Sequence, residues 1–161
     1  MKHAVIPGSF DPVTVGHLDL ITRAARLFDR VTVLVMQNPY KSSCVFTVEQ
    51  RLEMLRRAVA ALPGVFLDTD GALLADYCAS HHATLVKGVR DASDFAYESS
   101  MAHINYSLSG VETVLLTADP SVSFVSSTMV RELLRCGRDP SPYMPEGTAS
   151  LCLSFYNANR M

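Results

Sequence analysis

Short apolar runs alternate along this chain with longer segments of helical periodicity. The runs predicted as strands cover residues 4–6, 31–36, 65–67, 83–86 and 111–117. The second of them is β-branched and almost wholly apolar, which is typical of a strand covered on both faces. Strands that alternate with helices predict a parallel sheet with right-handed crossovers. We therefore expect an α/β fold with a five-stranded parallel sheet and helices on both faces.

Helices are predicted between and after these strands, over residues 18–28, 47–62, 73–79, up to 106, and 126–136. The second begins with a capping box, Thr47-Val48-Glu49-Gln50, and Pro63-Gly64 ends it. Either Asp91 or Asp94 is suited to cap the helix that runs to Tyr106. Residues 145–161 are weakly amphipathic, and we expect a terminal helix there.

Length and composition change this picture little. A chain of 161 residues, 48% hydrophobic and 19% charged, is expected to form one globular domain over residues 1–161. A net charge of −2 argues against a nucleic-acid partner bound by a broad basic surface. No apolar run approaches the roughly 18 residues of a membrane span, so no membrane partner is expected. The first predicted strand begins close to residue 1, so we expect no signal peptide.

Four scattered cysteines, Cys44, Cys78, Cys136 and Cys152, form no Cys-x-x-Cys pair. This usage fits reduced thiols and a cytoplasmic location. His81 and His82 are adjacent, which is a poor spacing for zinc ligands, so we expect surface histidines there.

The candidate chemistry is concentrated between the first strand and the first helix. Pro7-Gly8-Ser9-Phe10-Asp11-Pro12-Val13-Thr14-Val15-Gly16-His17 places glycines, a helix start and a histidine together. Glycines let a ligand approach the backbone, and a helix start offers unpaired N–H groups and a positive dipole end. The pattern predicts a phosphate site with a proton donor in it. Taken alone, the pair Gly16-His17 would mean little, because a histidine near a helix start is more often a surface residue.

Other polar strings also follow predicted strands. Lys41 lies in a predicted loop over residues 37–43, Lys87-Gly88-Val89-Arg90 ends the fourth strand, and residues 123–128 supply hydroxyl groups where a helix begins. Each has an ordinary alternative: an exposed lysine, a solvated charge pair, a serine-rich helix cap. Ligands of parallel sheets bind beyond the carboxyl ends of the strands, where the strand order reverses. We expect these strings to meet there.

In order and spacing the strings resemble the phosphopantetheine adenylyltransferase family, over about residues 4–145. The first string resembles the signature of nucleotidyltransferases that share a catalytic core with class I aminoacyl-tRNA synthetases. Asp94-Phe95-Ala96-Tyr97-Glu98 separates the family from related cytidylyltransferases. The resemblance implies a single-domain Rossmann-like nucleotidyltransferase fold and transfer of AMP from ATP to 4′-phosphopantetheine. The products would be 3′-dephospho-coenzyme A and pyrophosphate. The resemblance also implies that Mg²⁺ is held mainly by the ATP phosphates, without a metal ligand from the protein. It further implies a homohexameric assembly.

The resemblance also implies individual roles. His17 would stabilise the transition state, with Lys41 and Arg90 as further catalytic residues. The residues implied to bind ATP are Ser9, Phe10, His17, Gly88, Val89, Arg90, Glu98, Val122, Ser123, Phe124, Val125, Ser126, Ser127 and Thr128. The residues implied to bind the acceptor are Ser9, Lys41, Leu74 and Lys87. An acceptor phosphate is already a competent nucleophile, so direct in-line attack needs cations, donors and positioning, without a covalent intermediate.

Three other functions compete with this one. An adenylyltransferase for nicotinamide mononucleotide would share the first string, but the Asp-Phe-x-Tyr-Glu string speaks against it. The sequence supports a cytidylyltransferase for a small alcohol phosphate even less. A nucleotide sensor without catalysis is disfavoured by the joint presence of His17, Lys41 and Arg90, because a sensor does not need transition-state donors.

Overall fold

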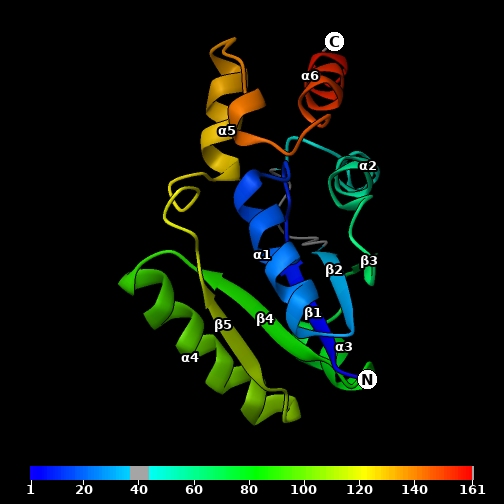
Figure 1. Ribbon diagram of the computed structural model, residues 1–161, viewed down its shortest axis with the longest axis vertical. Helices are drawn as coiled ribbons and strands as arrows, with labels where there is room; N and C mark the ends of the chain where they lie inside the picture. Colours follow the sequence, from blue (N-terminus) through cyan, green and yellow to red (C-terminus); the bar gives the residue numbers. More distant parts are fainter. Residues whose placement is uncertain (37–43, 161) are drawn as a thin grey trace.

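A computed structural model describes residues 1–36 and 44–160 of the chain. Its sheet contains five parallel strands in the order β3-β2-β1-β4-β5 (Figure 1). They are β1 (His3–Gly8), β2 (Arg30–Met36), β3 (Val65–Asp70), β4 (Thr84–Val89) and β5 (Thr113–Thr117). The predicted parallel α/β sheet is confirmed, and every predicted strand is present. The predicted loop over residues 37–43, which includes Lys41, lies outside the described residues.

The helices also follow the predicted order. They are α1 (Val15–Leu27), α2 (Val48–Val59), α3 (Leu74–Ser80), α4 (Ala92–Ser109), α5 (Ser127–Arg135) and α6 (Ala149–Ala158), with a 3₁₀ turn η1 (Ser141–Tyr143) before α6. Figure 1 shows α5 and α6 beyond the carboxyl end of the sheet and α4 beside β4 and β5. The choice left open for α4 is settled by its first turn: the Asp91 side chain accepts the Asp94 N–H at 2.8 Å and is the cap.

Each face of the sheet has its own apolar core. In β1, Ala4 and Ile6 belong to a cluster that includes Ile21 of α1, while Val5 belongs to a second cluster with Cys78 of α3. All five of these side chains are fully or almost fully buried. Alternate residues of one strand therefore contact opposite helical layers, which explains why the predicted strands are apolar at nearly every position.

The sheet opens between β1 and β4. All six residues of β1 pair with β2, but only Ala4 and Val5 pair with β4, opposite Thr84 and Leu85. The two central strands therefore stop pairing before their carboxyl ends. This is also where the strand order reverses, because the chain runs outward from β1 to β3 and then resumes on the other side with β4.

Candidate active site

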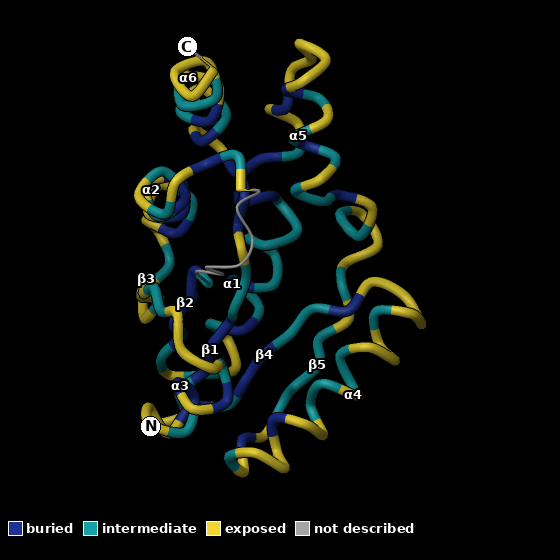
Figure 2. Tube along the Cα trace, turned by 180° about the vertical axis from the view of Figure 1, so that it is seen from behind, coloured by how far each residue is buried: buried dark blue, intermediate teal, exposed yellow. Residues whose placement is uncertain are grey.

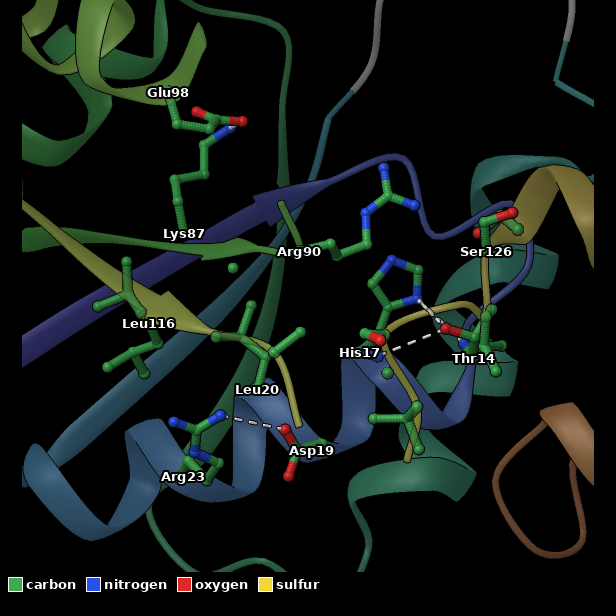
Figure 3. Close-up of a pocket in the computed structure, with 18 of the residues that line it drawn as sticks. Thr14, His17, Asp19, Leu20, Arg23, Lys87, Arg90, Glu98, Leu116 and Ser126 are labelled. Carbon is green, nitrogen blue, oxygen red and sulfur yellow. Dashed lines mark hydrogen bonds and ion pairs between the residues drawn. The ribbon is translucent and has the colours of Figure 1, made fainter. Parts of the chain in front are cut away.

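A pocket of about 300 Å³ lies at this opening. It is bounded by the first half of α1, the carboxyl ends of β4 and β5, the start of α4 and the segment that leads into α5 (Figure 3). The residues that line it are Pro7, Thr14, Gly16, His17, Asp19, Leu20, Arg23, Val86, Lys87, Gly88, Arg90, Glu98, Leu116, Ala118, Val122, Ser123, Val125, Ser126 and Ser127. Polar strings from four separate parts of the sequence thus share one cavity.

His17 belongs to the cap of α1. The Thr14 N–H donates to His17 Nδ1 at 3.0 Å, and the His17 N–H donates to the Thr14 hydroxyl at 3.4 Å, which completes a capping box. Because Nδ1 accepts a hydrogen bond, a neutral ring carries its proton on Nε2. The local structure of the helix start therefore selects the tautomer. His17 keeps one N–H donor available to a ligand in the pocket.

The surroundings of His17 keep the ring neutral. Desolvation is the main cause and the nearby charge of Arg90 the second, and together they lower the pKa of His17 to about 4. Figure 3 shows the Arg90 guanidinium next to the imidazole. The site therefore offers a neutral imidazole donor and a permanent guanidinium charge side by side, which suits a phosphate whose oxygens gain charge.

Phe10 supports His17 from within the protein. Its ring is buried and meets the His17 ring edge to face, with 4.9 Å between the centroids. The Phe10 backbone adopts a positive φ of 47°. A Cβ at Gly8 would lie 3.0 Å from the Phe10 ring, so glycine at position 8 makes room for it.

Two cations at the end of β4 are each paired with a carboxylate of α4. Lys87 Nζ lies 3.2 Å from Glu98 Oε1, and Arg90 Nε lies 2.8 Å from Asp94 Oδ2. Lys87 and Glu98 were implied to serve different substrates, yet here they touch each other. Hydrogen bonding from Arg90 is the main cause that lowers the pKa of Asp94.

The hydroxyl groups at the start of α5 serve the fold as well as any ligand. Ser126 caps the helix by accepting the Met129 N–H at 3.1 Å, and Ser127 donates to the Pro12 carbonyl at 2.7 Å. Thr128 Oγ1 accepts a hydrogen bond from Arg131 at 3.1 Å. The α5 start therefore offers a ligand mainly its first-turn backbone N–H groups and the positive end of the helix dipole.

Hydrogen bonds from other parts of the protein also hold residues 9–11 of the first string in place. The buried Asp11 carboxylate accepts the N–H groups of Val45 and Phe46 at 3.0 and 2.9 Å. Arg131 donates to the Asp11 carbonyl at 2.6 Å, and Arg51 donates to the Ser9 carbonyl at 2.7 Å. These contacts fix the backbone that leads to His17. Sequence reasoning missed both arginines, because nothing in their spacing connects them to residues 9–11.

Ten of the residues predicted for ligand binding line the pocket: His17, Lys87, Gly88, Arg90, Glu98, Val122, Ser123, Val125, Ser126 and Ser127. Six others do not line it: Ser9, Phe10, Leu74, Val89, Phe124 and Thr128. Leu74 begins α3 and packs with Met36 against the second apolar cluster, and Lys41 lies outside the described residues. The ligand roles of all seventeen residues, those in the pocket lining and those outside it, stay predictions.

Sequence reasoning also missed part of the lining. Leu20 and Arg23 follow His17 at three-residue intervals on α1, so this helical spacing was a usable signal. Arg23 pairs with Asp19 at 3.3 Å and donates to the Thr117 carbonyl at 2.6 Å, which ties α1 to the end of β5.

The four cysteines lie outside the pocket lining, and so do His81 and His82. Burial raises the pKa of Cys78 to about 11 and that of Cys152 to about 12. His81 stacks on Tyr77, with 4.2 Å between the ring centroids.

Residues 1–36 and 44–160 contain no group of three His, Cys, Asp or Glu side chains placed to hold a metal ion. None of the helices in this described part is long and apolar enough to cross a membrane.

Fold and site together define a nucleotidyltransferase of the cytidylyltransferase-like family, whose family model matches residues 5–133. Two solved structures share the fold at 16% identity. A bifunctional NMN adenylyltransferase/ADP-ribose pyrophosphatase from Francisella tularensis, complexed with AMP and a Mn ion, has a TM-score of 0.74 over 97% of this chain and 49% of its own. The nicotinic acid mononucleotide adenylyltransferase of Plasmodium falciparum, complexed with NaAD, has a TM-score of 0.72 over 99% of this chain and 98% of its own.

Curated relatives narrow the class further, and three of them are each named phosphopantetheine adenylyltransferase. The protein of Corynebacterium efficiens is 51% identical over 144 residues, covering 89% of this chain and 91% of its own. That of Corynebacterium glutamicum strain R is 46% identical over 155 residues, covering 96% of this chain and 97% of its own. That of Frankia casuarinae is 45% identical over 151 residues, covering 91% and 93%. This chain belongs to the phosphopantetheine adenylyltransferase family.

Proposed function

We propose that this chain transfers AMP from ATP to 4′-phosphopantetheine, which gives 3′-dephospho-coenzyme A and pyrophosphate. Family membership supports the reaction. The observation that carries the chemistry is the pairing of a neutral His17 Nε2–H donor with the Arg90 charge at the opening of the sheet. Both groups favour a phosphate that accumulates negative charge.

In the proposed reaction an oxygen of the acceptor phosphate attacks the α-phosphorus of ATP. The new bond joins that oxygen to the α-phosphorus, while the bond from the α-phosphorus to the bridging α–β oxygen breaks and pyrophosphate leaves with its electron pair. The nucleophile is already anionic, so no general base is needed. The tasks left to the protein are to align two anions and to stabilise charge in the transition state.

His17 is assigned the α-phosphate. Its Nε2–H would bond a non-bridging oxygen, and that bond would strengthen as the α-phosphorus becomes five-coordinate. Arg90 would neutralise the same phosphate chain. Lys87, together with Lys41 as implied by the resemblance, would hold the acceptor phosphate. The N–H groups at the start of α5 would bind the remaining ATP phosphates.

Mg²⁺ is proposed to enter with ATP as part of the substrate. Among the described residues, two carboxylates line the pocket, and both are engaged with cations: Asp19 with Arg23 and Glu98 with Lys87. A donor set of this kind fits a metal held mainly by phosphate oxygens better than one held by the protein.

We further propose that residues 1–161 act as one cytoplasmic adenylyltransferase domain and assemble as a homohexamer. Large apolar side chains exposed on α4 support self-association: Phe95, Tyr97, Ile104, Tyr106 and Leu108. Figure 2 shows how much of this helix is exposed in the single chain. The other side of α4 packs on the sheet and on α3, so these side chains are available to another copy.

The test is pyrophosphate release with ATP or CTP and each candidate acceptor in turn. We expect turnover with ATP and 4′-phosphopantetheine, and very little with dephosphorylated pantetheine, because the phosphate is the nucleophile. Lys87→Ala is expected to impair use of the acceptor more than binding of ATP. Equal turnover of pantetheine and its phosphate would contradict the proposal. Preferred use of nicotinamide mononucleotide or of CTP would instead support one of the competing functions.

A further inference from the structure

The start of α4 carries two carboxylates that face the two cations at the end of β4. Asp94 and Glu98 are one helical turn apart, and each pairs with one cation of the preceding string, Arg90 and Lys87 respectively. Positions i and i+4 share a face of a helix, so one short helical surface meets both cations. This explains why the two strings occur together in the sequence, and it leaves the role of Asp94 to be assigned.

Asp94 contacts Arg90 at three points. Its Oδ2 accepts Arg90 Nε at 2.8 Å and the Arg90 backbone N–H at 3.3 Å, while its Oδ1 lies 3.5 Å from Nη2. The carboxylate therefore meets the Nε–Nη2 edge of the planar guanidinium. An edge-on contact of this kind fixes the direction of the guanidinium plane as well as its position.

Asp94 is itself held firmly. It lies in the first turn of an 18-residue helix, and its N–H donates to the Asp91 side chain that caps this helix. Arg90 lies outside the helix, just after β4, so the pair joins the strand end to the helix. It differs in this respect from Arg56–Glu53 and Arg135–Glu132, which are exposed pairs within single helices.

The contact with Asp94 leaves the Nη1 side of Arg90 for other partners. Among the described residues, no hydrogen bond engages Nη1, and Figure 3 shows the guanidinium next to the His17 ring. The charge of Arg90 contributes to the lowered pKa of His17, so the two groups are electrostatically close. Without Asp94, a long side chain that is about half exposed would sample many other rotamers.

We infer that Asp94 is a positioning residue for adenylyl transfer, which orients Arg90 so that its Nη1 side meets the α-phosphate beside His17. The inference rests on the proposed function. Asp94 does not touch the reacting atoms in this assignment. A carboxylate near a phosphate site repels the ligand, and its orienting effect on Arg90 offsets that repulsion.

A double-mutant cycle with Asp94→Asn and Arg90→Ala tests the inference. Asp94→Asn keeps the shape of the side chain but removes its charge, and we expect kcat to fall about tenfold or more with a smaller change in KM for ATP. In the Arg90→Ala background, the same substitution should change kcat by less than about twofold, because its target is already absent. Glu53→Gln is the matched control: it removes a carboxylate from an exposed arginine pair remote from the pocket, and kcat should not change.

Three outcomes would overturn the inference. One is full activity of a folded Asp94→Asn protein while Arg90→Ala is impaired. Another is a loss in the double variant equal to the product of the two single losses. A third is an Asp94→Asn defect that excess Mg²⁺ restores, which would give the carboxylate a role in metal binding. If the unaltered protein transfers no AMP at all, the proposed function itself fails, and that outcome is seen before any variant is made.

Discussion

His17 shows how one side chain can close a helix and prepare a reaction. Its Nδ1 accepts the Thr14 N–H as the third residue of a capping box, a position usually held by Glu or Gln. The same bond leaves Nε2 as the donor, and desolvation keeps the ring uncharged near neutral pH. The tautomer and the direction of the donor thus follow from the start of α1, while burial and the charge of Arg90 keep the ring neutral.

Replacement of His17 by Ala should lower turnover by about 10²–10³, in line with the loss of one oxyanion donor. ATP affinity should change little, because the lost bond strengthens mainly in the transition state. The measurement is single-turnover kinetics with a parallel ATP titration on protein shown to be folded. A folded variant within about tenfold of the parent, a gap of roughly 1.4 kcal/mol, would remove His17 from its assigned role.

The lowered pKa of His17 also predicts a pH dependence of stability. The folded state holds this pKa at about 4, below the ordinary 6.5, so between these values the unfolded chain binds more protons. The contribution of the neutral ring is present above pH 6.5 and is lost as the pH falls towards 4. It amounts to up to about 3 kcal/mol at 1.36 kcal/mol per unit of pKa difference.

Urea unfolding at several pH values checks this, with His17→Gln as the comparison. Glutamine can accept the Thr14 N–H and keep the capping box, but it does not titrate. The unfolding free energy of the parent should fall more steeply than that of the variant between pH 6.5 and 4. His3, whose pKa is also lowered, is present in both proteins and cancels in the difference. Parallel curves for the two proteins would contradict the assignment.

At the scale of secondary structure, the sequence predicted most of the fold because the signals were local. Apolar runs, capping residues and Pro or Gly stops lie within a few residues of the boundaries that they define. The end of pairing between β1 and β4 was not predictable in this way, because it depends on two strands about 80 residues apart. The Phe10 ring direction escaped prediction too: a positive φ turns it inward, against His17.

The contacts of Asp11 also act between segments of the chain, because they join residues 7–17 to the segment that precedes α2. Its buried carboxylate accepts two backbone N–H groups, from Val45 and Phe46. Asp11→Ala leaves these two donors without their partner and should lower the free energy of unfolding by about 2–6 kcal/mol, at 1–3 kcal/mol for each unsatisfied buried group.

Urea unfolding of Asp11→Ala gives the measurement, and Asp139→Ala is its control. Asp139 also accepts a backbone N–H, from Ser141 at 2.9 Å, but it is exposed. Its loss should lower the free energy of unfolding far less than the loss of Asp11, because water can replace the carboxylate there. Equal losses for the two variants would mean that Asp11 does not anchor the segment that precedes α2.

At the scale of the whole molecule, α4 has three separate surfaces. Its first turns meet the cations at the pocket, one side packs on the sheet and α3, and large apolar residues are exposed at several places around the rest of the helix. An exposed helix face in a monomer is usually polar. The proposed assembly would therefore bury a surface that lies on the same helix as Asp94 and Glu98, so that contact between copies would support the helix that positions both cations.

Sedimentation velocity tests this assembly. We expect the parent to sediment at about six times the 17.6 kDa chain mass. Leu108→Glu, on the exposed side of α4, should shift the distribution to smaller species, because a carboxylate cannot be buried between copies without a partner. Leu27→Glu is the matched control, since Leu27 is exposed to a similar extent, 55% against 57%, but lies at the end of α1. Unchanged sedimentation of a folded Leu108→Glu protein would exclude the part of α4 around Leu108 as the contact, and a parent that sediments as one chain would exclude the hexamer.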